Sequence, residues 1–202
     1  MALGVIISFD LTCPYACVTG NAIRLSAHEC HMQLLLEWPD SAPRADGNDS
    51  EAFVSAARGG HCDVLRMLLG WPEHAPRADC RGGEALRAAA WGGHLPAVEL
   101  LLGWPEFAPR ADGWGGNALV LAAGGGHGAV ARLLLGQAFG APRANCLGGQ
   151  ALVMAAANGH EGVARMLLGW GTNAPRADCR SGNALVQAAK HGHYAVVSCG
   201  VT

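Results

Sequence analysis

The chain is poor in charged residues and contains no long apolar run. Only 15% of its 202 residues are Asp, Glu, Lys or Arg, against roughly 25% in ordinary soluble proteins. The formal net charge of −2 excludes a general electrostatic attraction to nucleic acid or to an anionic membrane. No window approaches the roughly 18 apolar residues that cross a bilayer, so no transmembrane helix is expected.

The first residues lack the pattern of an exported protein. Residues 1–9 are apolar but short, Asp10 follows them, and no basic region precedes them, so no cleaved secretory signal is expected. The eight cysteines show no small-domain disulfide framework. Without an export signal, they are expected to be reduced thiols in a cytoplasmic or nuclear protein.

Catalytic motifs are missing as well. The sequence has no Walker loop, no Gly-x-Gly-x-x-Gly after a strand, and no Ser or Cys in a nucleophile motif. Carboxylates are few, and the glycine runs at 92–93 and 124–126 are interpreted below as turns between helices. We therefore expect no enzyme activity, no cofactor and no metal.

What the sequence has in abundance is repetition. The string Ala-Pro-Arg-Ala followed by Asp or Asn recurs five times at a step of 33 residues, and the dipeptide Gly-His keeps the same step. The string begins at Ala42, Ala75, Ala108, Ala141 and Ala174. The histidines of the dipeptide are His61, His94, His127, His160 and His193. Two independent markers in one register define a repeat architecture.

Residues 79–111 show what one unit contains. Four small or apolar residues recur at helical spacing and predict a short first helix. A glycine pair then ends that helix, His94 opens a second one, and Pro96 lies in its first turn, where proline is tolerated. Pro105 ends the second helix because proline disfavours helix in the residue before it. The first set is Ala85, Leu86, Ala89 and Ala90, and the second helix carries Val98, Leu100, Leu101 and Leu102.

One helix pair cannot bury its leucine face alone. A fully buried Leu contributes about 1.5–3 kcal/mol, and backbone ordering costs about 1–2 kcal/mol per residue. Stacking supplies the missing neighbour, and the small residues of the first helix let adjacent units approach closely. The sequence therefore predicts a solenoid of stacked helix pairs.

This 33-residue helix-pair repeat, with Gly-His before the second helix and a run of leucines within it, resembles the ankyrin repeat. The resemblance covers about residues 13–202 and implies an all-α solenoid with extended finger loops between units. In the unit 79–111 the matching positions are Asp79, Gly82, Leu86, Ala89–Ala90, Gly93–His94, Val98 and Leu100–Leu102.

The sequence also departs from the ankyrin pattern. The family's Thr-Pro-Leu-His opening of the first helix reads Glu84-Ala85-Leu86-Arg87 here. The connecting loops contain proline, as in residues 104–109, and proline lacks the backbone donor that a β-hairpin needs. The fingers are therefore expected to be extended loops with little strand pairing.

The repeat register divides the chain into four parts. Residues 1–12 form an N-terminal extension, 13–45 an irregular first repeat, 46–177 four regular repeats and 178–202 a truncated last repeat. Neither end shows the polar outer face that terminal units need. The chain is therefore interpreted as a fragment of a longer array, or as one whose ends fray or self-associate.

The ankyrin resemblance implies that a partner binds the concave surface, formed by the finger tips and the exposed side of each first helix. Positions there vary between units while framework positions repeat, and Trp and Arg are enriched at binding hot spots. Arg81, Trp91 and Trp114 are expected to form one anchor patch, although solvated variation without a partner is the alternative. The predicted partner-binding residues are Arg58, Arg81, Arg87, Trp91, Trp114, Leu147, Arg180 and Lys190. The expected function is a scaffold that binds an unidentified protein.

Four further columns of repeated residues are interpreted as structural. The tryptophans are expected to cover the end of each leucine face, and the arginines to pair with the Asp or Asn two residues later. The Gly-His histidines are expected to hold turn backbone, and the cysteines are too far apart for disulfides. These columns are Trp38, Trp71, Trp104 and Trp170; Arg44, Arg77, Arg110, Arg143 and Arg176; and Cys80, Cys146 and Cys179. A basic ladder that binds an acidic peptide is the alternative for the arginines.

One N-terminal cluster contains residue types that bind zinc. It consists of Cys13, Cys17, His28, Cys30 and His31. The spacing is no firm zinc pattern, and His31 already matches the histidine of the repeat. A redox- or zinc-responsive switch built on this cluster is therefore the alternative function, beside a structural fragment of a larger ankyrin-repeat protein.

Overall fold

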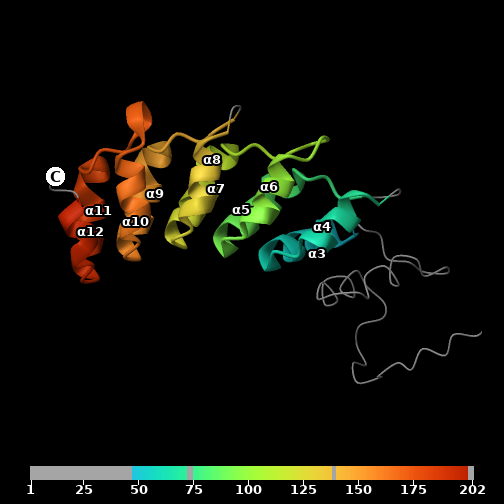
Figure 1. Ribbon diagram of the computed structural model, residues 1–202, viewed down its shortest axis with the longest axis horizontal. Coiled ribbons are helices and arrows are strands. Elements are labelled where there is room, and N and C mark those ends of the chain that lie inside the picture. Colours follow the sequence, from blue (N-terminus) through green and yellow to red (C-terminus); the bar gives the residue numbers. More distant parts are fainter. Residues whose placement is uncertain (1–46, 72–74, 138–139, 200–202) are drawn as a thin grey trace, which may run out of the picture.

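The computed structural model describes residues 47–71, 75–137 and 140–199. Helix pairs stand side by side in sequence order along this part of the chain (Figure 1). The first helices of the pairs are α3 (Gly47–Gly59), α5 (Cys80–Gly92), α7 (Gly113–Gly124), α9 (Cys146–Ala157) and α11 (Cys179–Lys190). The second helices are α4 (Cys62–Leu69), α6 (Leu95–Leu102), α8 (Gly128–Leu135), α10 (Glu161–Leu168) and α12 (Tyr194–Cys199). A single 3-10 turn, η1 (Gly171–Asn173), follows α10.

The helices form two layers. Each first helix packs on the first helices of its neighbours, from α3 to α11, and the second helices form a parallel row from α4 to α12. No strand occurs within the described ranges. The all-α solenoid predicted from the repeat is therefore confirmed, and the described parts of the fingers are loops without strands, as expected. One backbone hydrogen bond, from Asp112 N to Gly140 O at 2.7 Å, joins two consecutive fingers.

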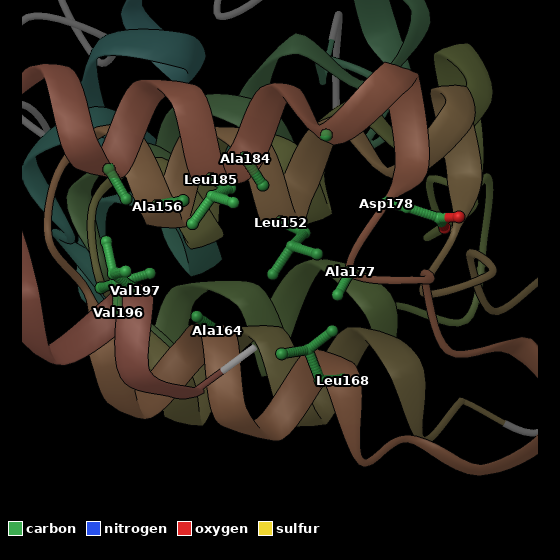
Figure 2. Close-up of a pocket in the computed structure, with 12 residues that line it drawn as sticks. Leu152, Ala156, Ala164, Leu168, Ala177, Asp178, Ala184, Leu185, Val196 and Val197 are labelled. Atoms are coloured by element: carbon green, nitrogen blue, oxygen red, sulfur yellow. The ribbon is translucent and has the colours of Figure 1, made fainter. Parts of the chain in front are cut away.

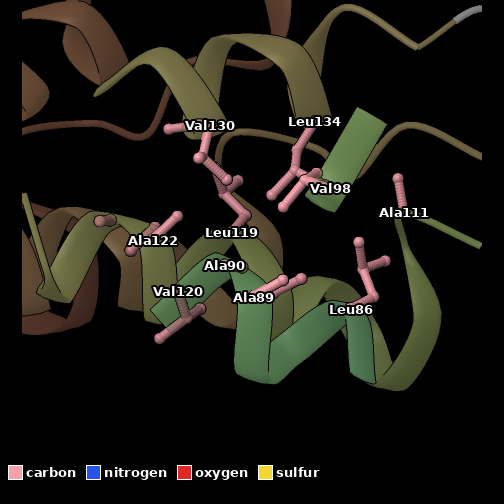
Figure 3. Packing of buried hydrophobic residues seen from close by; sticks show 14 of the residues in the cluster. Leu86, Ala89, Ala90, Val98, Ala111, Leu119, Val120, Ala122, Val130 and Leu134 are labelled. Atoms are coloured by element: carbon pink, nitrogen blue, oxygen red, sulfur yellow. The ribbon is translucent and has the colours of Figure 1, made fainter. Parts of the chain in front are cut away.

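The core lies between the two layers and repeats with the sequence. Alanines of the first helices, such as Ala89 and Ala122, are fully buried where neighbouring first helices touch. Leucines of both layers fill the space between them, and Figure 3 shows Leu119 of the first helix α7 and Leu134 of the second helix α8. Trp71, Trp104 and Trp170 are half-buried and pack against this core, which confirms their structural interpretation. Trp38 lies outside the described residues.

Histidine side chains tie each unit to the one before it. In four units the ring of the Gly-His histidine reaches a backbone carbonyl in the last turn of the preceding first helix. The contacts are His94 Nε2 to Arg58 O at 2.9 Å, His127 Nε2 to Trp91 O at 3.0 Å, His160 Nε2 to Gly124 O at 3.0 Å and His193 Nε2 to Ala157 O at 2.9 Å. Carbonyls in the last turn of a helix have no partner within the helix. The ring satisfies such a carbonyl and joins two units, so the histidines do hold backbone, but in the neighbouring unit.

Four glycines of the Gly-His dipeptides, Gly60, Gly93, Gly126 and Gly159, receive the histidine ring of the following unit. Gly93 has φ +72°, a left-handed conformation that side chains with a Cβ rarely adopt. A Cβ at Gly93 would overlap the ring of His127, and a Cβ at Gly60 would lie 2.5 Å from Nδ1 of His94. The repeated Gly-His is thus a two-sided joint, since the glycine accommodates the next unit and the histidine bonds to the previous one.

We predict that Gly93→Ala lowers the unfolding free energy by at least about 2 kcal/mol, because it combines a left-handed backbone with a steric clash. The matched control is Gly113→Ala, where a Cβ meets nothing within 4 Å and where other units carry cysteine. Urea unfolding followed by circular dichroism measures both variants. Equal urea midpoints for Gly93→Ala and Gly113→Ala would contradict the role of Gly-His as a joint between units.

Candidate functional site

The exposed side of the first helices carries the residues predicted to bind a partner. We call this surface the first-helix face. Trp91 and Trp114 are 51% and 68% exposed, and Leu147 is also exposed. Large apolar side chains at such exposure do not contribute fully to the core of the monomer. The first-helix face comprises Glu51, Arg58, Arg81, Glu84, Arg87, Ala88, Trp91, Trp114, Leu121, Leu147, Met154, Arg180 and Lys190.

A left-handed turn opens the first helices α5, α7, α9 and α11 and carries part of this face. In α5 the residues Arg81, Gly82 and Gly83 have φ values of 51°, 65° and 79°, and right-handed helix follows from Glu84. The equivalents of Arg81 in α7, α9 and α11 are Trp114, Leu147 and Arg180, all with φ between 50° and 54°. A non-glycine residue in this conformation costs about 1–2 kcal/mol. The sequence analysis did not predict this turn, although a glycine pair follows Arg81, Trp114 and Leu147 and was a signal for it.

A shallow hollow lies on the first-helix face where α3, α5 and α7 meet. Its volume is about 230 Å³. Arg58 of α3 and Leu121 of α7 lie on either side of α5, which supplies the remaining residues. Those residues are Glu84, Arg87, Ala88 and Trp91. Three of the predicted partner-binding residues, Arg58, Arg87 and Trp91, are therefore brought together in one site.

The arginines Arg81 and Arg87 make different kinds of contact near the hollow. Arg81 is engaged, because its guanidinium lies 3.0 Å from Glu51 Oε2 and 2.8 Å from Glu84 Oε2. Arg87 instead lies over the indole of Trp114, at 5.0 Å from its centroid, which is the geometry of a cation–π contact. Arg81 and Trp114 therefore adjoin the hollow without lining it.

The remaining predicted residues lie farther along the row. Arg180 Nη1 donates to the Leu147 carbonyl at 3.1 Å, which links α11 to α9. Lys190 is exposed in the last turn of α11. Sequence reasoning missed Glu51, Glu84, Ala88 and Leu121. Only Glu84 gave a signal, because it follows Arg81 at the i,i+3 spacing of a helical ion pair.

Most described arginines of this column form ion pairs within the chain. Arg77, Arg110 and Arg176 each form a two-pronged pair with the Asp two residues later, with distances between 2.9 and 3.2 Å. The hydrogen bond from Arg110 lowers the pKa of the Asp112 carboxyl. The predicted local pairing is confirmed for these three arginines. Arg143 precedes Asn145 and has no ion pair with the described residues, and Arg44 lies outside them.

Cys62, Cys80, Cys146 and Cys179 form no disulfide. Cys146 Sγ lies 3.9 Å from Gly116 O and Cys179 Sγ lies 4.0 Å from Gly149 O, each in the preceding unit. Burial raises the pKa of both thiols, which lowers the fraction of reactive thiolate. No group of metal-ligating residues occurs in the part of the chain that the structure describes. The cluster of Cys13, Cys17, His28, Cys30 and His31 lies outside that part.

A family model described as ankyrin repeats (3 copies) matches the chain twice, over residues 86–178 and 119–199. The chain belongs to the ankyrin-repeat family. The two matches together cover more than half of the chain. No curated protein matches the sequence. Ankyrin repeats are in general modules for protein–protein interaction. None of the described helices is long and apolar enough to cross a bilayer.

One departure from the ankyrin pattern falls within the hollow. Glu84 stands where the family has the threonine of Thr-Pro-Leu-His, and Arg87 stands where it has the histidine. In this ankyrin stack Glu84 pairs with Arg81, and Arg87 lies over Trp114. The changed positions therefore place charged side chains on the first-helix face, while the Gly-His histidines bond neighbouring units.

Proposed function

We propose that the first-helix face binds a partner protein at the hollow between α3, α5 and α7, and that the chain acts as a scaffold without catalysis. The observation that carries this proposal is the exposure of Trp91 and Trp114 beside Arg58 and Arg87. Trp and Arg at the centre of a well-packed patch are the residue types that dominate binding energy. This face corresponds to the concave surface that the ankyrin resemblance implies.

The rigid frame beneath the patch supports this proposal. The hollow is built from three consecutive units, and two histidine hydrogen bonds, from His94 and His127, hold those units together. Both acceptor carbonyls belong to residues of the hollow, Arg58 and Trp91. A preorganised surface loses less entropy when it binds. The carboxylates near the hollow, Glu51 and Glu84, are occupied by Arg81 and are poorly placed for acid–base chemistry.

We predict that a triple variant, Arg81→Ala, Trp91→Ala and Trp114→Ala, loses a protein that the wild type captures from extract of the native cell. Truncating a hot-spot residue costs about 2 kcal/mol or more, so the triple variant should weaken binding beyond detection by capture. The control is Arg132→Ala with Arg165→Ala, which removes exposed arginines from second helices. Helicity is compared first for all variants. If the triple variant and the control variant capture the same proteins, the proposal is wrong.

A specific observation favours self-association as a second candidate. Leu185 and Val186 of α11 are 52% and 57% exposed, whereas the equivalent Leu152 and Val153 of α9 are 3% and 4% exposed. In α9 these side chains are covered by the next unit. Leu185 also borders an apolar pocket of about 250 Å³ enclosed by α9, α10, α11 and α12 (Figure 2). We propose that a second copy of the chain covers this open side of α11.

We predict that Val186→Glu shifts the protein toward monomer in sedimentation velocity, because a carboxylate cannot be buried in an apolar interface without a partner. Ala129→Glu adds the same charge at an exposed position of α8 and should leave the mass distribution unchanged. A wild type that is monomeric at every concentration tested, or a Val186→Glu variant that associates like the wild type, would contradict this candidate.

A further inference from the structure

The first-helix face is locally basic, although the chain as a whole carries a net charge of −2. Its carboxylates, Glu51 and Glu84, both pair with Arg81. The described residues place no carboxylate within ion-pair distance of Arg58 or Arg87. Elsewhere the chain pairs several exposed arginines locally, as in Arg66–Asp63 and Arg110–Asp112. Among the residues that the structure describes, the two arginines at the hollow thus have no carboxylate partner.

These two arginines share the hollow with apolar side chains. Ala88, Trp91 and Leu121 line it, and Glu84, which pairs with Arg81, completes the lining. Its volume of about 230 Å³ lies below the roughly 300–1,000 Å³ of sites for small ligands. The hollow suits one large apolar side chain, and groups next to that side chain would come near the guanidinium groups of Arg58 and Arg87. Carboxylates are the protein groups that a guanidinium binds most strongly.

From this arrangement we propose that the partner contributes an acidic segment whose large apolar side chain enters the hollow lined by Arg58 and Arg87. The proposal rests on the proposed function of the first-helix face and names the chemistry of its partner. The carboxylates of the segment pair with the two guanidinium groups, and its apolar side chain packs on the exposed indole of Trp91.

The rest of the face gives the length of the segment. Beyond the hollow, α9 presents the uncharged Leu147 and Met154, and α11 presents Arg180 and Lys190. Packed helices lie about 8–10 Å apart, and an extended chain advances about 3.3 Å per residue. About three residues of the segment therefore cover one repeat, and about twelve reach from α3 to α11. A second acidic group near the far end of the segment would meet Arg180 and Lys190.

The experiment is a selection of random peptides of about twelve residues displayed against the whole chain, followed by affinity measurements on an enriched peptide. We expect enrichment of Asp and Glu around a Leu, Ile, Phe or Trp. The double variant Arg58→Gln and Arg87→Gln should weaken the enriched peptide at least about tenfold, and high salt should weaken it for the wild type. Arg132→Gln on α8 removes an equivalent exposed charge and should leave the affinity unchanged.

The other outcomes separate this inference from the proposed function. Enriched peptides that are neutral or basic, yet lost with Trp91→Ala, would overturn the acidic chemistry and leave the protein-binding face standing. Peptides unaffected by Trp91→Ala and by the double arginine variant would overturn both, as would the absence of any enrichment. A mixed-sequence single-stranded DNA that displaces the peptide at equal concentration would show a polyanion site and overturn the acidic segment.

Discussion

The hydrogen bond from a histidine ring to the helix end of the preceding unit is the interaction on which the rest of the solenoid depends. It satisfies a carbonyl that its own helix leaves unpaired and fixes the distance between neighbouring units at four junctions. The ring lies on the glycine of the preceding Gly-His, which leaves no space for a Cβ. The turn sequence is therefore constrained by two neighbours, and this explains why Gly-His recurs at the 33-residue step.

A constant frame determines where the sequence is free to vary. The buried alanines and leucines, the Gly-His joint and the paired arginines recur at fixed positions of the 33-residue unit. The exposed side of the first helices is under none of these constraints, and there the units differ, with Arg81, Trp114 and Leu147 at one equivalent position. The same joints that fix the frame end on the carbonyls of Arg58 and Trp91. The repeated Gly-His joint thus holds the candidate site in place, and the variable side chains of the first helices make it differ from unit to unit.

The fold was predictable because two sequence markers share one period, and the period requires stacked units. The exposure of Trp91 and Trp114 also followed from their register positions. The left-handed turn at Arg81 was missed because patterns of apolar residues report helix faces and carry no information on the sign of φ; the glycine pair that follows Arg81 was the signal for it. The Arg81–Glu51 pair and the contribution of Leu121 to the hollow were missed because both join different units, and the distance between units depends on packing that one unit does not encode. The same reason explains why the histidines were assigned to their own turns.

The most direct test of this account is the tautomer of the ring in each joint. A carbonyl oxygen only accepts hydrogen bonds, so the ring that contacts it must carry hydrogen on Nε2. Long-range proton–nitrogen correlation spectra of the ¹⁵N-labelled chain distinguish the two ring nitrogens. We expect His94, His127, His160 and His193 to be fixed as the Nε2–H form at a pH where imidazole is neutral. Rings that carry hydrogen on Nδ1, or that exchange rapidly between the two forms, would contradict the joint and the rigid frame derived from it.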